Sequence, residues 1–210
     1  MNKNEFYTNL FHRFRKLVED NDLLNEEVKI TGRALTSEEA IGNTERKDFP
    51  IIKGKEKLLQ ADFKGAKGQA FTDMPNNFHA NLKEIIEMTL QTNFDTAVYI
   101  ATLNAVCRYL GIIDNTIHCK DGEPENCALE LVEYVKNKYG NPKIALIGFQ
   151  PAMLENLSKN YKVRIADLDA NNIGKVKYGI MVEDGGKPID DLLNWCDIVV
   201  ATGSTIANKT

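Results

Sequence analysis

Residues 143–169, KIALIGFQPAMLENLSKNYKVRIADLD, contain the pattern that decides the fold. The stretch begins with an apolar run at 144–147, and a second apolar run at 163–166 ends on acidic residues. An apolar run without polar alternation is typical of a parallel strand that is covered on both faces. Pro151 lies between the runs, and proline suits the first position of a helix, where its missing N–H costs nothing. The stretch therefore predicts a strand, a helix and a second strand, the first half of a Rossmann-like unit.

The turn after the first run does not have the dinucleotide fingerprint. That fingerprint places three glycines at G-x-G-x-x-G, and this turn has one, Gly148. Asp167 and Asp169 nevertheless follow at about twenty residues, where such folds place a ribose-binding acid. Nicotinamide binding is disfavoured because a pyrophosphate could not approach the first turn closely. Two interpretations stay open: the acids contact another anionic or cationic ligand, or they are structural and cap residues 171–173.

The rest of the C-terminal half continues the alternation of strand and helix. A polar connection at 114–124, DNTIHCKDGEP, predicts a domain boundary. A helix begins at Pro124, and a third apolar strand starts after Asp197. Because strands alternate with helices through short links, we expect a parallel sheet. We therefore predict an α/β protein with a Rossmann-like domain at 116–210, preceded by a smaller α+β domain at 1–115.

The N-terminal half has mixed patterns. Apolar residues at helical spacing predict a helix at 4–20, and alternation at 27–35 predicts a half-buried strand. Two further helices are expected at 81–90 and 95–110, and short strands or extended loops at 49–52 and 65–71. Within the expected loops, Lys53-Gly54-Lys55 is either a solvated hairpin turn or a loop that contacts an anion.

Composition excludes several classes of function. The 210 residues have a formal net charge of -4 and no basic stripe, so a nucleic-acid partner is not expected. No apolar run reaches the roughly 18 residues that would span a bilayer, and the charged start is not typical of a signal peptide. We therefore expect a cytoplasmic protein without a membrane partner. In that reducing compartment the four cysteines are expected to be free thiols or metal ligands.

The carboxyl ends of the expected strands are the candidate ligand site. Parallel sheets bind ligands there because the turns place backbone N–H groups and helix amino termini around one crevice. Three such ends are at 148–151, 167–169 and 202–205. Gly203 and Ser204 either line a ligand or cap the next helix. No histidine pairs with Ser204 in a recognisable motif, so a hydrolase triad is not supported, and the sequence does not decide whether the protein is an enzyme.

Two smaller signals concern metals and buried amides. His118, Cys119 and Cys127 form H-C-x7-C, which lacks the close cysteine pairs of zinc sites. Cys127 is then either a packed thiol or, with the other two, a ligand of a soft or borderline transition metal. Asn104 lies in an apolar helix and either clamps a neighbouring backbone segment or faces a ligand cleft. Cys107 and Cys196 are expected in the core, and His12 and His79 at the surface.

Several of these motifs together resemble one family. They are Asn104-Ala105 in a buried helix, the H-C…C segment before a helix, the I-G-F-Q-P turn, the A-D-L-D acids and V-V-A-T-G-S-T-I-A-N. The combination resembles the putative heavy-metal chelation family, whose members join an enolase-amino-terminal-like domain to a Rossmann-like domain. The resemblance implies a ligand or metal site in the cleft between the domains. The residues that it implies are Gly148, Phe149, Pro151, Asp167, Asp169, Gly203, Ser204 and Asn208.

The leading prediction for function is therefore binding of a metal ion, or of a small molecule that carries one, with a transition metal as the cofactor to test. An enzyme that uses a nucleotide-like cofactor such as S-adenosylmethionine at the same strand ends is the alternative from a second class. A non-catalytic assembly module is the third. A second copy of the chain, in a homodimer, is a further expected partner.

Overall fold

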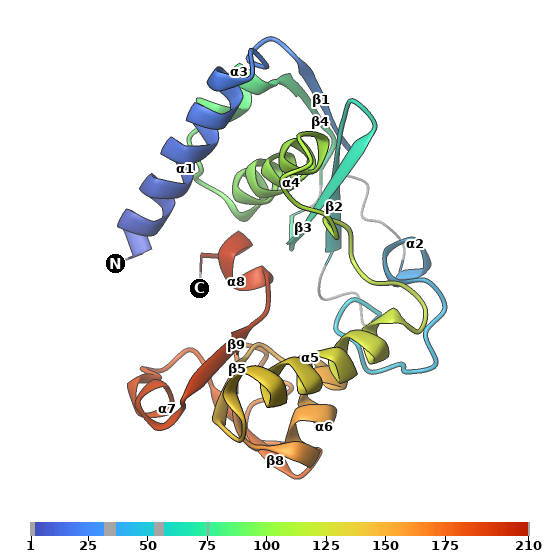
Figure 1. Cartoon of the computed structure of the whole chain (residues 1–210), viewed down its shortest axis with the longest axis vertical. Coiled ribbons are helices and arrows are strands. Elements are labelled where there is room, and N and C mark those ends of the chain that lie inside the picture. Colours follow the sequence, from blue (N-terminus) through green and yellow to red (C-terminus); the bar gives the residue numbers. More distant parts are fainter. Residues whose placement is uncertain (1–2, 32–36, 53–56, 75, 210) are drawn as a thin grey trace. The chain divides into compact units, whose positions relative to one another are not determined.

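The computed structural model describes residues 3–31, 37–52, 57–74 and 76–209 (Figure 1). It contains two compact units. The first comprises residues 1–40, 54–118 and 206–210, and the second comprises 41–53 and 119–205. The Lys53-Gly54-Lys55 turn and the end of the strand expected at 27–35 lie outside the described residues. None of the described helices is both long and apolar enough to cross a membrane.

The first unit is built on a four-stranded antiparallel sheet with the order β3-β2-β1-β4. Its strands are β1 (Glu27–Thr31), β2 (Lys57–Phe63), β3 (Ala66–Thr72) and β4 (Phe78–Asn81). The residues expected at 65–71 therefore form a strand, whereas those at 49–52 form a turn closed by Ile52 N donating to Phe49 O at 3.1 Å. β2 and β4 were not expected from the sequence.

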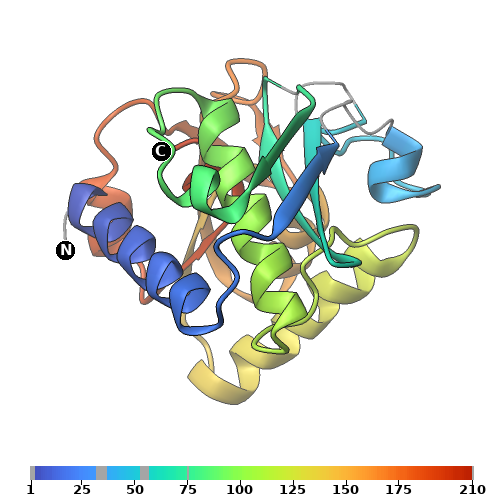
Figure 2. The same cartoon turned by 90° about the horizontal axis from the view of Figure 1, so that it is seen from above.

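Helices cover this sheet. They are α1 (Lys3–Asp20), α3 (Leu82–Ile86) and α4 (Asn93–Tyr109), and the short α2 (Ser37–Ile41) follows β1 in the chain. The helix expected at 81–90 is shorter than predicted: it begins after Asn81, which pairs with β1 and caps the helix, and it ends at Ile86, with Glu87 as its C-cap. Figure 2 shows α4 lying across the sheet. A Cβ at Gly68 on β3 would overlap the backbone of Ala101 and Ala105, so glycine permits this close approach of α4.

The second unit is built on a five-stranded sheet with the order β7-β8-β6-β5-β9. Its strands are β5 (Lys143–Ile147), β6 (Lys162–Asp167), β7 (Val176–Lys177), β8 (Ile180–Asp184) and β9 (Ile198–Ala201). Neighbours are parallel except β7, which forms a hairpin with β8. The predicted fold class, a parallel sheet in the C-terminal half preceded by an α+β part, is confirmed. The boundary at 115/116 and the likeness of each part to a named domain stay predictions.

The two faces of the parallel sheet are covered by different helices. On one face α5 (Glu123–Tyr139) and α6 (Pro151–Asn160) lie together, over a core that includes Ile144, Leu146 and Ile165. On the other face α7 (Asp190–Trp195) brings Leu192 against the small side chains of Ala145 and Ala166. Figure 1 shows α7 apart from α5 and α6. Residues after β9 form α8 (Ser204–Ala207).

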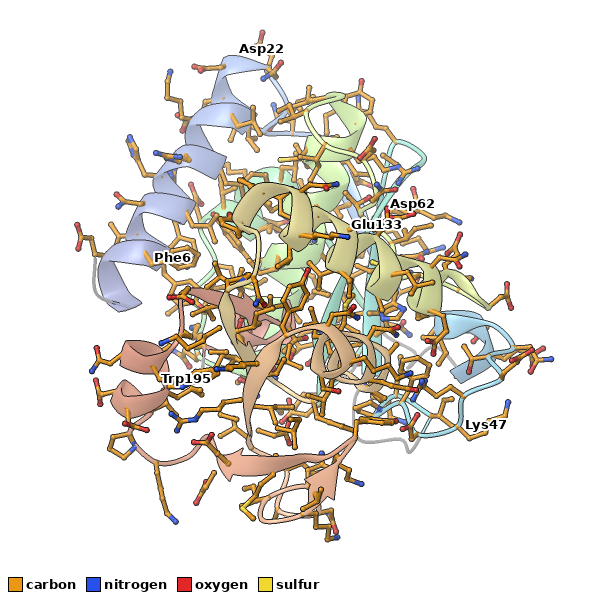
Figure 3. All side chains as sticks on the ribbon, turned by 60° about the horizontal axis from the view of Figure 1, so that its bottom comes forward. Phe6, Asp22, Lys47, Asp62, Glu133 and Trp195 are labelled. Atoms are coloured by element: carbon orange, nitrogen blue, oxygen red, sulfur yellow. The ribbon has the colours of Figure 1, made fainter. Side chains whose placement is uncertain are left out.

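Basic side chains pack on the exposed side of α7. Trp195, labelled in Figure 3, has Lys143 Nζ at 5.7 Å and Arg164 Cζ at 5.4 Å from its ring centroid. Arg164 also forms two hydrogen bonds of 2.7 Å to Glu183 on β8. This cluster ties the end of α7 to the sheet through cation–π and ionic contacts.

Candidate functional site

The order in which strands are added to the parallel sheet reverses between β5 and β9. From β5 the chain continues to β6 and then β8 on one side, whereas β9 pairs with the other side of β5. Ligands of open parallel sheets bind outside the carboxyl ends of the strands at such a reversal. The turns that meet there are the ones that the sequence predicted, at 148–151 and 202–205.

Gly148 is required where these two turns meet. Its φ is 87°, and a Cβ on it would lie 2.5 Å from Cγ2 of Thr202. Gly148 N donates to Ala166 O at 2.8 Å, and Thr202 N donates to Ile147 O at 3.0 Å. The β5 turn is therefore held from both neighbouring strands, and only glycine combines this backbone conformation with the available space.

Asp167, at the end of β6, is a structural acceptor. Its Oδ2 accepts a hydrogen bond of 2.7 Å from Phe149 N, and its Oδ1 accepts from Asp169 N at 2.7 Å and from Asn172 Nδ2 at 3.3 Å. The carboxylate thus joins the β5 turn to the β6 turn. A metal ion at Asp167 would have to share the oxygens that hold both turns.

Asp169 also accepts hydrogen bonds within its own turn. Its Oδ1 accepts from both the backbone N and the Nδ2 of Asn171, at 2.9 Å each, and its backbone O accepts from Asn172 N at 2.8 Å. These contacts are those of the structural interpretation, in which the acids cap residues 171–173. The structure thus supplies capping contacts for both acids, and their role in ligand binding stays a prediction.

The β5 turn presents different chemistry. Phe149 is buried, and Gln150, which precedes the first helical residue Pro151, forms no side-chain cap to α6 among the described residues. The first-turn N–H groups of a helix have no intrahelical partner and carry a partial positive charge. Lys177 on β7 places its Nζ 5.7 Å from the centre of the Phe149 ring. Lys177 could not be identified from sequence patterns, because the β7–β8 hairpin that positions it was not expected.

The third strand end is packed as a cap. Ser204 is buried, and its N and Oγ lie 3.5 and 3.3 Å from Oγ1 of Thr202. Thr205 Oγ1 donates to Thr202 O at 2.8 Å. Gly203 is exposed, with open space around its Cα in the part of the chain that the structure describes. The capping side chain is therefore Thr202, and Gly203 is the position that stays open to a ligand.

Two of the predicted residues, Asn104 and Asn208, belong to the first unit. Asn104 Nδ2 donates to Gln69 O at 3.0 Å, which is the backbone clamp that the structural interpretation predicted. In the segment 206–210, Tyr7 OH donates to Ile206 O at 2.5 Å. Oδ1 of Asn208 is buried and has no hydrogen-bond partner among the described residues.

The predicted metal ligands do not form a three-residue cluster. Among the described residues, no group of three His, Cys, Asp or Glu side chains could hold a metal ion. His118 packs edge-on against Phe71, with ring centroids 5.5 Å apart. Cys119 and Cys127 are free thiols, and both are partly buried. Burial, followed by the interactions with Cys127, raises the pKa of the Cys119 thiol.

The remaining predictions concerned the exposure of two histidines and two cysteines. His12 and His79 are exposed, as expected. Cys107 and Cys196, expected in the core, are both partly buried, and Cys196 packs against the core beneath α7. A shallow pocket in the first unit is lined by Arg108, Gly111, Ile112, Ile113 and Asp114. It contains none of the predicted site residues.

Sequence reasoning missed a charged network around Arg46. Arg46 donates from Nε to Glu125 at 2.6 Å, from Nη1 to Tyr178 OH at 2.6 Å, and from Nη2 to the Glu155 carboxylate. Tyr178 OH donates to Asp48 Oδ2 at 2.5 Å. Burial opposes the charge on Arg46, but the bonds to Glu125 and Glu155 outweigh it and raise the pKa of the guanidinium. Burial and the bond to Asp48 raise the pKa of Tyr178 to about 12.

The chain matches one family model, mainly in the second unit, and two solved structures over nearly its whole length. Residues 130–210, less than half of the chain, match the model of the DUF364 family, described as "Putative heavy-metal chelation". No curated protein matches the chain. Two crystal structures, both of proteins with unknown function from the DUF364 family, are similar to it.

The first of these structures comes from Pyrococcus horikoshii, with 15% identity and a TM-score of 0.52, covering 95% of this chain and 69% of that chain. The second comes from Desulfitobacterium hafniense DCB-2, with 11% identity and a TM-score of 0.52, covering 97% and 72%. At these identities the likeness shows the fold alone. The predicted resemblance is confirmed for residues 130–210, which match the model described as "Putative heavy-metal chelation" and contain all five strands of the parallel sheet.

Proposed function

We propose that the second unit binds an anionic small molecule that carries a metal ion, at the carboxyl ends of β5 and β9. The observation that carries the proposal is the reversal of strand order between these two strands, with the amino terminus of α6 directly after β5. Metal chelation itself is suggested by the description of the family that residues 130–210 match.

The contacts of the two acids favour a chelate over a bare ion. Both oxygens of Asp167, and Oδ1 of Asp169, already accept hydrogen bonds from the protein. A bare ion at these strand ends would therefore have to compete with backbone and side-chain donors for the same carboxylate oxygens. In a chelate, the small molecule supplies most of the metal ligands, and the protein needs to bind only its outer anionic groups.

The groups that remain around the β5 turn suit such an anion. The first turn of α6 offers backbone N–H groups and the positive end of the helix dipole. Lys177 adds a positive charge above Phe149, and Gly203 leaves the neighbouring turn without a side chain. Phe149 provides an apolar floor beside these polar groups. Together they form a small site for a carboxylate or phosphate group of the chelate.

Thermal unfolding in the presence of defined ligands tests this proposal. The probes are Fe(III)–citrate and Ni(II)–citrate, compared with citrate alone and with each metal ion alone. A ligand at about 100 times its Kd stabilises the folded state by about 2.7 kcal/mol. We expect this response for a citrate chelate, and a much weaker response for the bare ions.

Two variants test whether the stabilisation by a chelate arises at the proposed site. Lys177→Met should weaken it, whereas Lys175→Met, which changes an exposed lysine of the preceding loop, should leave it unchanged. Equal responses in the two variants, or no stabilisation by any chelate at excess, would overturn the proposal. Including S-adenosylmethionine in the same screen tests the alternative prediction of a nucleotide-cofactor enzyme, which stabilisation by that compound alone would favour. An oligomer that responds to none of these ligands would favour the assembly module.

A further inference from the structure

The β7–β8 hairpin carries Lys177 near its tip, beyond the part that the parallel sheet holds. β8 pairs with β6 from Val182 onward, whereas residues 176–181 pair only within the hairpin in the part of the chain that the structure describes. A two-stranded hairpin is at best marginally stable by itself. Contacts of the tip with other segments therefore determine where the Lys177 side chain lies.

The turn of this hairpin contains a tyrosine where glycine or asparagine is favoured. Its two central residues, Tyr178 and Gly179, have φ angles of 50° and 81°, and a type I′ turn requires positive φ at both positions. A bulky side chain is uncommon in this left-handed region. The contacts of the Tyr178 side chain, rather than the geometry of the turn, therefore explain the tyrosine.

The Tyr178 hydroxyl is held by two residues of the segment 41–53. It accepts a hydrogen bond from Arg46 Nη1 at 2.6 Å and donates one to Asp48 Oδ2 at 2.5 Å. We call these two hydrogen bonds the Tyr178 clamp. Arg46 Cζ also lies 5.6 Å from the centre of the Tyr178 ring, and Arg46 is itself held by carboxylates of α5 and α6. The clamp thus joins the hairpin tip to a segment that is anchored on two helices.

The environment of Asp48 indicates what the clamp does. Oδ1 of Asp48 is buried and has no hydrogen-bond partner among the described residues. A buried acceptor without a partner destabilises the folded state. The placement of Asp48 therefore favours a positioning role for its bond to Tyr178 over a purely stabilising one.

We propose that the Tyr178 clamp holds Lys177 over Phe149, which makes Arg46, Asp48 and Tyr178 positioning residues of the proposed chelate site. Lys177 directly precedes Tyr178, and its Nζ lies 5.7 Å from the centre of the Phe149 ring. Without the clamp, the turn and the ammonium group beside it are free to move away from the ring. The part of Lys177 in chelate binding rests on the proposed function, whereas its position over Phe149 can be measured without a chelate.

Tyr178→Phe removes the clamp and keeps a ring that packs against the core. Tyr161→Phe is the matched control, because Tyr161 OH donates to Val132 O at 2.8 Å and the control therefore loses a hydroxyl hydrogen bond of α6 and α5 instead. Chelate binding should become about tenfold weaker or more in Tyr178→Phe, the equilibrium factor of one hydrogen bond to a charged group. It should be unchanged in Tyr161→Phe.

NMR of protein with ¹³C-dimethylated lysines gives the readout that needs no chelate. The signal of Lys177, identified by its loss in Lys177→Met, should lie upfield of the signal of the exposed Lys175, because the Phe149 ring shields it. In Tyr178→Phe the Lys177 signal should move to the position of the Lys175 signal. In Tyr161→Phe it should stay in place.

Two substitutions of Asp48 repeat the test without changing the turn. Asp48→Asn keeps an acceptor for the Tyr178 hydroxyl and should leave both readouts unchanged, whereas Asp48→Ala should reproduce the effects of Tyr178→Phe. A Lys177 signal that keeps its position in Tyr178→Phe and Asp48→Ala, or that moves equally in Tyr161→Phe, would contradict the proposal. If no chelate stabilises the unaltered protein, the proposed function fails, and the Lys177 signal still decides whether the clamp positions the lysine.

Discussion

Asp167 and Arg46 both tie distant parts of the second unit together, but they use different kinds of partner. Asp167 accepts two backbone N–H groups and one amide, and its longest link spans 18 residues, to Phe149. Arg46 donates to side chains that lie 79, 109 and 132 residues away. The Asp167 carboxylate binds neutral donors, whereas Arg46 binds two carboxylates, and salt screens such contacts between opposite charges.

The difference indicates that Asp167 and Arg46 have separate structural roles. Asp167 sets the shape of the β5 turn, since Phe149 and the residues that begin α6 follow directly from the bond that it accepts. Arg46 attaches the segment 41–53 to α5, α6 and the β7–β8 turn. Loss of Asp167 should therefore damage the candidate site itself, whereas loss of Arg46 should release a segment that covers the helices.

Replacing Asp167 with alanine should have the largest effect on stability. It leaves Phe149 N, Asp169 N and Asn172 Nδ2 without their acceptor, and an unsatisfied buried donor costs about 1–3 kcal/mol. We expect a loss of about 3 kcal/mol in the free energy of unfolding, measured by urea denaturation. Glu130→Ala, at an exposed position of α5, should change it by less than about 0.5 kcal/mol. A loss for Asp167→Ala no larger than that of the control would show that the turns hold without the carboxylate.

Replacing Arg46 with methionine should have an intermediate effect. It leaves Glu125, Glu155 and Asp48 close together without their shared cation, although Glu125 is 41% exposed and Glu155 25% exposed. Because water screens these carboxylates in part, we expect a loss of about 2 kcal/mol, below the 3–5 kcal/mol typical of a fully buried pair.

Hydrogen exchange should show where the Arg46 variant loosens. We expect faster exchange in the segment 41–52 and unchanged exchange in β5 and β6. Lys47→Met is the matched control, because Lys47 Nζ contacts only the backbone O of Thr44 in the described hydrogen bonds, at 2.6 Å. Equal exchange in the two variants would mean that Arg46 does not anchor the segment.

The parallel sheet could be predicted from the sequence because its central strands are locally distinctive. Strands covered on both faces are typically continuous apolar runs; β5 has one, and β6 is apolar apart from Arg164 between its charged ends. β2 and β4 were missed for different reasons: residues 57–63 alternate only in part, and β4 is only four residues long and overlaps at Asn81 with the predicted helix. Their pairing with β1 comes from contacts distant in sequence, which local periodicity does not contain.

The candidate site shows the same limit. The three strand ends were predictable, since each follows an apolar run and ligand sites of parallel sheets lie there. Which groups remain available could not be predicted, because it depends on partners such as Phe149 N for Asp167 and Gln69 O for Asn104. Arg46 gave no signal at all. It lies in the polar stretch NTERKD, which is typical of a solvated loop, and only the tertiary structure surrounds it with carboxylates.

The smallest expected effect is a pH dependence of the stability that Glu155, a partner of Arg46, contributes. Hydrogen bonds from Lys159 and then Arg46 lower the pKa of Glu155 below its ordinary value. A carboxyl group whose pKa is lower in the folded state stabilises the protein above the unfolded pKa, and the contribution is lost as the pH falls through the folded pKa. Glu155→Gln should therefore cost up to about 1 kcal/mol near pH 7 and clearly less near pH 3, in urea denaturation at both pH values. A cost that is the same at both pH values would mean that Glu155 stabilises the protein through packing. The ion pair between Arg46 and Glu155 would then contribute little to stability.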